Sequence, residues 1–430
     1  MKKSSDSKKK NPIHQYAPVV EELRKLLEKN SKIKAALLAS LKVACDKAKK
    51  ELNEELYQGI NDVFQGNGWP TTLENYYHYL DSYVRLVPNE STDPNYPNAW
   101  KSTGDKNGYN QKVYDLLCQF YWLVDQPAPK SKKTLQSFEK FAQWLVDFAV
   151  AWGEFLDTPE SLTKESLRSF KYNPMYNYPL YAKNEASWTT FNEFFYREFN
   201  KANKKTGTSP VRPIAAPNNN NIITAPADCT FKALYSIDKE GNVLDTTGKH
   251  TQVTLKHTHT IGSIQELLND SPYADAFKEG TFVHYFLGPF DYHRFHTPIA
   301  GKVLEVADIS GKVYLNVNME EGQFDAPDGA DNGYEFYQAR GLVIVDGGKK
   351  VGKVAILPIG MAQVSGVEMY MDLQGKKVVK GQEFGRFRFG GSDIILLFEK
   401  NPDLYLFKRD PGHNPIHFQY GQVAAYWEVE

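Results

Sequence analysis

The stretch Phe389-Gly390-Gly391-Ser392-Asp393-Ile394-Ile395-Leu396-Leu397-Phe398 places a Gly-Ser pair directly before an apolar run. The run is rich in strand-forming residues and follows two glycines, so it predicts a β-strand. Gly391-Ser392 has two readings. Such a pair is most often an ordinary turn. A serine after glycine can also attack the preceding carbonyl carbon when a base removes its proton, and the pair is then a candidate self-cleavage site.

Composition sets the broad class of the protein. The chain has 430 residues, of which 41% are hydrophobic and 13% aromatic, which is ample for a packed core. A net charge of -1 argues against a nucleic-acid partner. The helical apolar stretches carry charges and fall short of the roughly 18 to 20 clean residues that a transmembrane segment needs. Three scattered cysteines are typical of a reducing compartment, so we expect a cytoplasmic location.

The apolar periodicity changes once along the chain. Residues 1–15 predict a disordered basic tail, 16–185 a helical N-terminal domain, and 186–430 a second domain made mainly of strands, for which the motifs described below imply a catalytic role. The fold class is α+β, with a mainly antiparallel β-sandwich or barrel-like core after the helices. The expected strands are short and rich in β-branched residues: Val283–Phe286, Lys302–Val306, Tyr314–Val317, Leu342–Val345, Lys353–Leu357 and Ile394–Phe398.

Helices are expected where apolar residues recur at helical spacing. One stripe joins Val19, Leu23, Leu26 and Leu27, and further helices cover about 114–124 and 138–155. Thr71 and Glu74 have the spacing of a capping box for the helix that carries Leu73, Tyr77, Leu80 and Val84, and Thr190 with Glu193 has the same spacing before Phe191–Phe199.

A set of motifs in the second half of the chain resembles one enzyme family. The segment Asp291-Tyr292-His293-Arg294-Phe295-His296 is similar to the signature of phosphatidylserine decarboxylases. Phe191–Phe199, Ala225–Asp228 and Lys380–Gly385 resemble other family elements in the expected order. The N-terminal helical region and the absence of an evident anchor resemble the soluble branch that includes fungal-type L-tryptophan decarboxylases. The resemblance covers about residues 187 to 400.

The resemblance implies a role for each of four residues. Ser392 would be the nucleophile of self-cleavage, His296 the base, and Asp228 the carboxylate that fixes the imidazole tautomer. His293 would lie at the substrate and serve the decarboxylation step. The alternatives are that both histidines merely cap loops beside a sheet, and that Asp228 is a turn carboxylate bonded to its own backbone.

The resemblance also implies the cofactor. Cleavage between Gly391 and Ser392 would convert Ser392 into a pyruvoyl group, which forms a Schiff base with an amine and accepts electrons as CO2 leaves, so neither a metal nor pyridoxal phosphate is expected. The function implied is therefore that of a carboxy-lyase made as a zymogen.

Two residues depart from the family pattern and bear on the substrate. Asp393 stands where Thr or Ser is usual, and Cys229 replaces a glycine. Asp393 either points to solvent or binds at the substrate, where a carboxylate about 5 Å from a phosphate would cost roughly 3 kcal/mol. We therefore expect a free amino acid, aromatic and tryptophan-like, as the substrate. The alternative is a phosphatidylserine headgroup, with phosphatidylethanolamine as the product. A non-catalytic scaffold or lipid-binding homologue remains a third reading, and a homodimer is left open.

Overall fold

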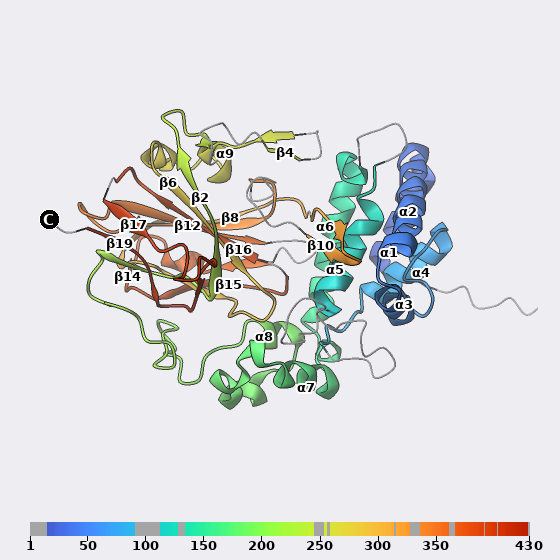
Figure 1. Ribbon diagram of the computed structural model, residues 1–430, viewed down its shortest axis with the longest axis horizontal. Helices are drawn as coiled ribbons and strands as arrows, with labels where there is room; N and C mark the ends of the chain where they lie inside the picture. The colour runs from blue at the N-terminus through green and yellow to red at the C-terminus, as the bar shows by residue number, and fades with distance from the viewer. Residues whose placement is uncertain are drawn as a thin grey trace, which may run out of the picture.

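The computed structural model describes residues 15–90, 112–127, 134–244, 253–255, 259–313, 315–326, 336–360, 366–390, 392–401 and 403–428. A helical half stands beside a half made of strands (Figure 1), as the α+β prediction requires. The tail predicted for residues 1–15 lies almost entirely outside the described residues.

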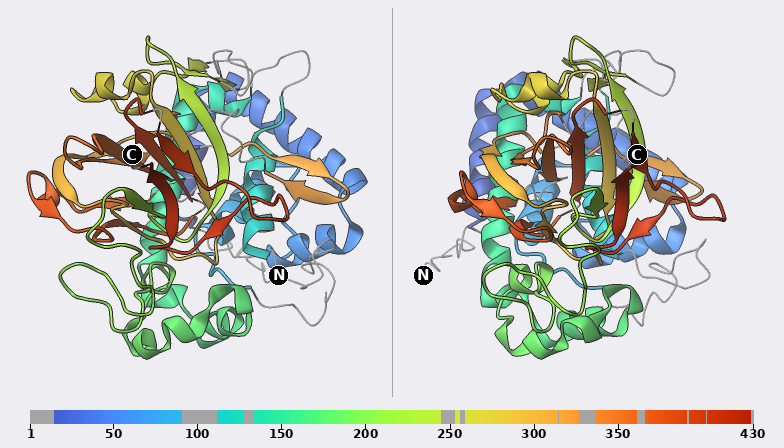
Figure 2. Two further views of the ribbon diagram at one scale, coloured as in Figure 1. Left: turned by 60° about the vertical axis from the view of Figure 1, so that its left-hand side comes forward. Right: turned by 90° about the vertical axis from the view of Figure 1, so that its left-hand side faces the viewer.

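The N-terminal helices form as the periodicity predicts. They are α1 (Pro18–Lys29), α2 (Ser31–Glu51), α3 (Glu54–Val63), α4 (Leu73–Tyr83), α5 (Lys112–Val124), α6 (Glu139–Leu156) and α7 (Lys164–Tyr172). In α1 the predicted stripe is buried at Val19, Leu23 and Leu27. Figure 2 shows these helices packed behind the strands, and the larger apolar core contains residues of both halves.

Of the two predicted capping boxes, one is wrong by one residue and the other is confirmed. The cap of α4 is Thr72, whose hydroxyl accepts a hydrogen bond from the Asn75 amide, so the box predicted at Thr71 is wrong by one residue. The box at Thr190 and Glu193 is confirmed. The helix that it begins, α8 (Phe191–Phe195), ends earlier than predicted.

A central antiparallel sheet of nine strands carries the second half of the described chain. Its order is β14 (Lys377–Val378), β8 (Gly301–Ile309), β11 (Arg340–Asp346), β12 (Lys353–Gly360), β16 (Ser392–Phe398), β6 (Thr281–Leu287), β2 (Cys229–Ile237) and β18 (His417–Phe418), with β3 (Val243–Leu244) paired to β2. The strand expected at 314–317 is wrong for residues 315–317, which have no regular structure, and Tyr314 lies outside the described residues. Leu315 and Val317 are buried against the core without a strand partner, which explains their apolar alternation.

Smaller sheets surround the central one. They pair β1 (Ile222–Thr224) and β17 (Leu404–Leu406) with β19 (Val423–Trp427), β13 (Val367–Met369) and β7 (Arg294–His296) with β15 (Glu383–Phe387), β9 (Asn318–Glu320) with β10 (Gln323–Asp325), and β4 (Val253–Leu255) with β5 (His259–Ile261).

Strand β16 lies in the middle of the central sheet and is buried on both faces. Ile394 and Leu396 belong to the larger apolar core, which the N-terminal helices share. Ile395 and Leu397 belong to a second core on the other face, where α9 (Ile264–Leu267) packs. Burial on both faces is the physical reason that this strand reads as a continuous apolar run. Within the described residues no helix is both long and apolar enough to cross a membrane.

Candidate functional site

Ser392 is the first residue of β16 and lies opposite Gly360 of β12 and Leu287 of β6. Its side chain is fully buried, and its hydroxyl has no hydrogen-bond partner among the described residues. A buried hydroxyl without a partner costs free energy, so its retention here needs a reason. Gly391, the other half of the predicted cleavage pair, lies outside the described residues.

Asp393 points to the opposite face of the sheet from Ser392, because side chains alternate along a strand. Its carboxylate is fully buried, with Oδ1 3.3 Å from Nε2 of His284. Asp393 does not point to solvent, as one of the two placements considered would require. Its carboxylate is buried on the face of the sheet that carries the second core, and substrate binding by this residue stays a prediction.

His293 lies against an aromatic wall beside the segment that leads to Ser392. Its ring stacks on Phe195 of α8 at 3.8 Å between centroids, and its carbonyl accepts the amide of Phe387 at 2.8 Å. Burial, assisted by the positive charge of Arg197, holds the pKa of His293 well below its usual value. The imidazole is therefore neutral at physiological pH and can accept a proton.

Arg197 belongs to the Phe191–Phe199 motif and contacts the main chain of the Asp291–His296 motif. Its guanidinium is buried and donates to the carbonyl groups of Phe290 and Asp291, three and two residues before His293. The same guanidinium lies 4.6 Å from the centre of the Tyr181 ring. Arg197 thus fixes the main chain that presents His293.

His296, in β7, is fully buried and held by both ring nitrogens. Nδ1 lies 2.8 Å from the carbonyl oxygen of Gly381, and Nε2 lies 2.9 Å from the hydroxyl of Tyr292. A carbonyl can only accept, so Nδ1 carries the proton and Nε2 accepts from Tyr292. Burial lowers the pKa of His296 to about 3. The imidazole is thus neutral, with its basic nitrogen occupied by Tyr292 in this structure.

Asp228 joins the same cluster through other partners. Its carboxylate accepts hydrogen bonds from Arg212 at 2.8 Å and from the amide of Tyr420 at 2.7 Å. Burial raises the pKa of Asp228, against the opposing effect of Arg212. The Tyr420 ring stacks on His296 at 3.8 Å, so Tyr420 lies between the carboxylate and the imidazole. In this structure the Gly381 carbonyl, and not Asp228, sets the tautomer of His296.

Three contributors to this cluster were not selected from the sequence. Tyr292 lies inside the quoted histidine signature, so its position gave a signal. Gly381 acts through its main chain, and its positive φ of 78° and the close approach of Ile214 both favour glycine there. Tyr420 lies in none of the motifs and is far from His296 in the sequence, so only the fold brings the two side chains together.

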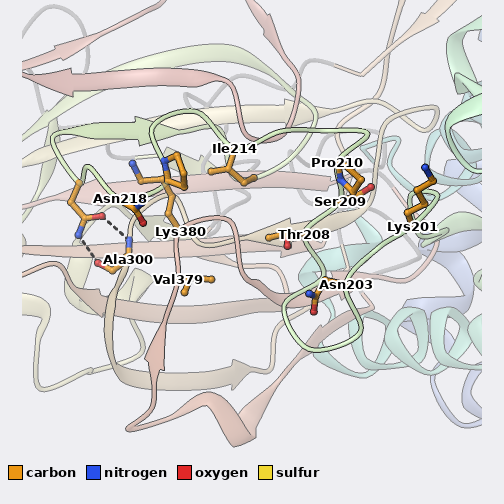
Figure 3. Close-up of a pocket in the computed structure, with 12 residues that line it drawn as sticks. Lys201, Asn203, Thr208, Ser209, Pro210, Ile214, Asn218, Ala300, Val379 and Lys380 are labelled. Atoms are coloured by element: carbon orange, nitrogen blue, oxygen red, sulfur yellow. Dashed lines mark hydrogen bonds between the residues drawn. The ribbon is translucent and has the colours of Figure 1, made fainter.

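A large cavity of about 930 Å³ is lined by residues of the 201–220 segment together with Ala300, Val379 and Lys380 (Figure 3). Asn220, one of the lining residues, pairs with Ala300 through two hydrogen bonds of 2.6 and 2.9 Å. Lys380 donates to three carbonyl oxygens, which uses the hydrogen-bonding capacity of its ammonium. Neither Ser392 nor the two histidines line it, so we do not assign the reaction to this cavity.

The described part of the chain contains no set of side chains that could bind a metal ion. No group of three or more His, Cys, Asp or Glu side chains there is arranged to hold a metal ion. Cys229, which follows Asp228, is fully buried, and burial raises the pKa of its thiol well above the usual value. The structure therefore accommodates this residue as an inert core side chain.

Comparison with known proteins gives a consistent result. The family model described as phosphatidylserine decarboxylase matches residues 191–424. A phosphatidylserine decarboxylase proenzyme of Fusobacterium nucleatum is 31% identical over 251 residues, 58% of this chain and 72% of the relative. One of Clostridium perfringens is 30% identical over 301 residues, 68% of this chain and 89% of the relative. Proenzyme 2 of Oryza sativa subsp. japonica is 34% identical over 217 residues, 50% of this chain and 30% of the relative.

The names of these relatives bear on the substrate expected from the sequence. All three are phosphatidylserine decarboxylase proenzymes, so the resemblance to tryptophan decarboxylases gains no support from them. The matched region begins at α8 and includes every residue of the cluster described above.

Proposed function

Because the chain belongs to the phosphatidylserine decarboxylase family, a family of carboxy-lyases, we propose that it is a pyruvoyl-dependent decarboxylase of phosphatidylserine that matures by self-cleavage between Gly391 and Ser392. The observation that carries the proposal is the Ser392 hydroxyl, buried without a partner at the start of a central strand. A pyruvoyl group forms by elimination from a residue that carries a leaving group on Cβ, as the acylated Ser392 oxygen would be, so the residue type fits.

The self-cleavage step uses the chain's own atoms. The Ser392 hydroxyl attacks the Gly391 carbonyl carbon, the peptide C–N bond breaks, and an ester forms as a base takes the hydroxyl proton. Elimination then releases the Gly391 carboxylate, and water completes the conversion of residue 392 with loss of ammonia. The resulting pyruvoyl group supplies an electron-accepting carbonyl for decarboxylation.

The two histidines are suited to different proton transfers. His296 has a fixed tautomer and can act as base through Nε2 once the Tyr292 hydroxyl turns away. His293 is neutral and lies against the wall that leads to residue 392, so it can take up a proton and return it to substrate carbon. These roles, and that of Asp228 as the nearby carboxylate, are part of the proposal.

Phosphatidylserine is preferred over a free aromatic amino acid for two reasons. The relatives are named for phosphatidylserine. The side chain of Asp393 also points to the opposite face of the sheet from Ser392, which weakens the repulsion that argued against a phosphate. The domain boundaries, a cytoplasmic location and a homodimer stay predictions.

Intact-mass measurement of the purified protein tests the cleavage. We expect one chain of residues 1–391 and one of residues 392–430 whose N-terminus is blocked as pyruvoyl. A single uncut chain would contradict the enzyme and support the scaffold reading. The cut protein is then given vesicles containing phosphatidylserine, free serine or free tryptophan, and the released CO2 is measured. Turnover of tryptophan but not of the vesicles would overturn the proposed substrate.

A further inference from the structure

The segment just before the proposed cleavage site is held by helices of both the N-terminal region and the matched region. We propose that α6 and α8 form a clamp on Arg388 and Phe389 that positions the Gly391-Ser392 bond for cleavage, with Trp152 and Asp157 as positioning residues. This inference rests on the proposed function, because it concerns the same self-cleavage.

Phe389 fills an aromatic socket. Its ring is buried and meets three other rings nearly edge-on: Trp152 of α6 at 5.5 Å and 89°, Phe191 at 5.0 Å and 85°, and Phe195 at 5.2 Å and 84°. Edge-to-face contacts of this kind are favourable and directional. The indole of Trp152 is itself fixed, because its Nε1 donates to the carbonyl of Leu86. The socket therefore holds Phe389 in one position.

A chain of hydrogen bonds holds the main chain at the same place. The amide of Phe389 donates to Oδ1 of the buried Asn192 at 3.0 Å. Nδ2 of Asn192 donates to Asp157 at 2.9 Å, and the second oxygen of Asp157 accepts from Arg388 at 2.8 Å. Asp157 follows α6 directly as its C-cap residue. One carboxylate at the end of α6 thus orients two residues of the clamp.

The two sides of the scissile bond are held by different parts of the protein. Ser392 and the residues after it are fixed by the pairing of β16 with β12 and β6. The side chains of Phe389 and Arg388 contact α8, α6 and the C-cap residue of α6, and the amide of Arg388 donates to the carbonyl of Gly366. Attack of a hydroxyl on the preceding carbonyl is fast only when the reacting atoms are held in near-attack geometry. Because glycine has no side chain that could hold residues 390 and 391, the clamp on Phe389 restrains the chain that leads to the reacting carbonyl.

The socket also connects the segment with His293. Phe195 packs against Phe389 on one side and stacks on the His293 imidazole on another. Helix α6 lies outside the region that the family model matches. The helical half therefore contributes to maturation through Trp152 and Asp157, beyond its role in the common core.

The rate of cleavage after synthesis in a cell-free system, followed by intact mass, tests the clamp. We expect Trp152→Leu to slow cleavage about 10- to 100-fold, the range that a small displacement of reacting groups produces. Trp152→Phe keeps an aromatic edge and should recover most of the rate. The matched control is Trp144→Leu in the same helix, since Trp144 is equally buried but packs on Phe141 and Phe148. Thermal unfolding of each variant in a Ser392→Ala background compares their stabilities.

A second pair of variants tests the hydrogen bonds of Asp157 with Asn192 and Arg388, and it leaves the apolar core side chains in place. Asp157→Ala should slow cleavage, whereas Asp147→Ala, on the exposed side of α6, should not. This pair stays informative if Trp152→Leu does not fold. A wild-type chain that stays uncut would refute the proposed function. A wild-type chain that is cut, with both Trp152→Leu and Asp157→Ala cut as fast as their controls, would refute the clamp alone.

Discussion

Arg212 and Asp228 form the buried ion pair of the site, and Arg212→Met should be strongly destabilising. Their side chains are each 6% exposed, with Nη2 and Oδ2 2.8 Å apart. At an effective dielectric of about 20 this distance corresponds to about 6 kcal/mol of attraction. Methionine keeps much of the packing volume but leaves a buried carboxylate without its cation, so we expect a loss of about 3 to 5 kcal/mol in the free energy of unfolding near neutral pH.

The loss should depend on pH in a defined direction. Burial already raises the pKa of Asp228, while Arg212, the Tyr420 amide, His417 and Arg197 lower it. A carboxyl group whose folded pKa is raised destabilises the protein increasingly as pH rises from the unfolded pKa through the folded one. Removing Arg212 raises the folded pKa further and widens that window. The loss should therefore be largest near neutral pH and should shrink as the pH falls and the carboxyl of the variant becomes protonated.

Urea unfolding measures this prediction in a Ser392→Ala background, because a single uncut chain is needed for a simple unfolding free energy. The control is a double-mutant cycle with Asp228→Asn, which removes the negative charge. In that background Arg212→Met should cost much less and should lose its pH dependence. An equal loss with and without the carboxylate would show that Arg212 acts only through packing, such as its contact with the Phe199 ring.

Three further predictions follow from the same cluster. Ser392→Ala and His296→Ala should stay uncut by intact mass, whereas His293→Ala should be cut and turn over phosphatidylserine poorly; an uncut His293 variant would mean that the two roles are wrongly separated. Gly381→Ala should lower the free energy of unfolding by about 1 to 3 kcal/mol, because the φ of Gly381 is 78° and a Cβ would lie 2.6 Å from a side-chain carbon. A thermal midpoint equal to that of wild type would contradict this. The Cys229 thiol is buried with a raised pKa, so a thiol reagent should label it only after urea unfolding, and rapid labelling of the native protein would place it at an accessible site.

The fold could be predicted where one local signal determined the structure. The helical stripes and the apolar run of β16 needed only periodicity and burial, and both are confirmed. The strand expected at 314–317 failed because alternation reports burial rather than pairing. Leu315 and Val317 satisfy the alternation by packing into the core from an extended segment. Strand pairing depends on segments far apart in the chain, and a local pattern does not contain it.

The site could be predicted as a set of residues but not as a set of contacts. The motifs identified Ser392, Asp228 and the two histidines. Serine-hydrolase logic then suggested a direct contact between Asp228 and His296. In the structure Asp228 accepts from the main-chain amide of Tyr420, whose ring stacks on His296, and the Gly381 carbonyl binds the imidazole. A main-chain acceptor and a distant tyrosine leave no spacing signature, so only the fold reveals them.

Asp393 shows how one such contact changes a functional conclusion. From the sequence, a carboxylate next to the reactive serine counted against any substrate with a phosphate. That argument required both side chains to face the same cavity, yet neighbours on a strand point to opposite faces. Burial opposite His284 places the charge of Asp393 across the sheet from the Ser392 side chain. The departure from the family pattern therefore lies on the face of β16 that carries the second core, and it weighs less against the phospholipid headgroup proposed to bind at residue 392.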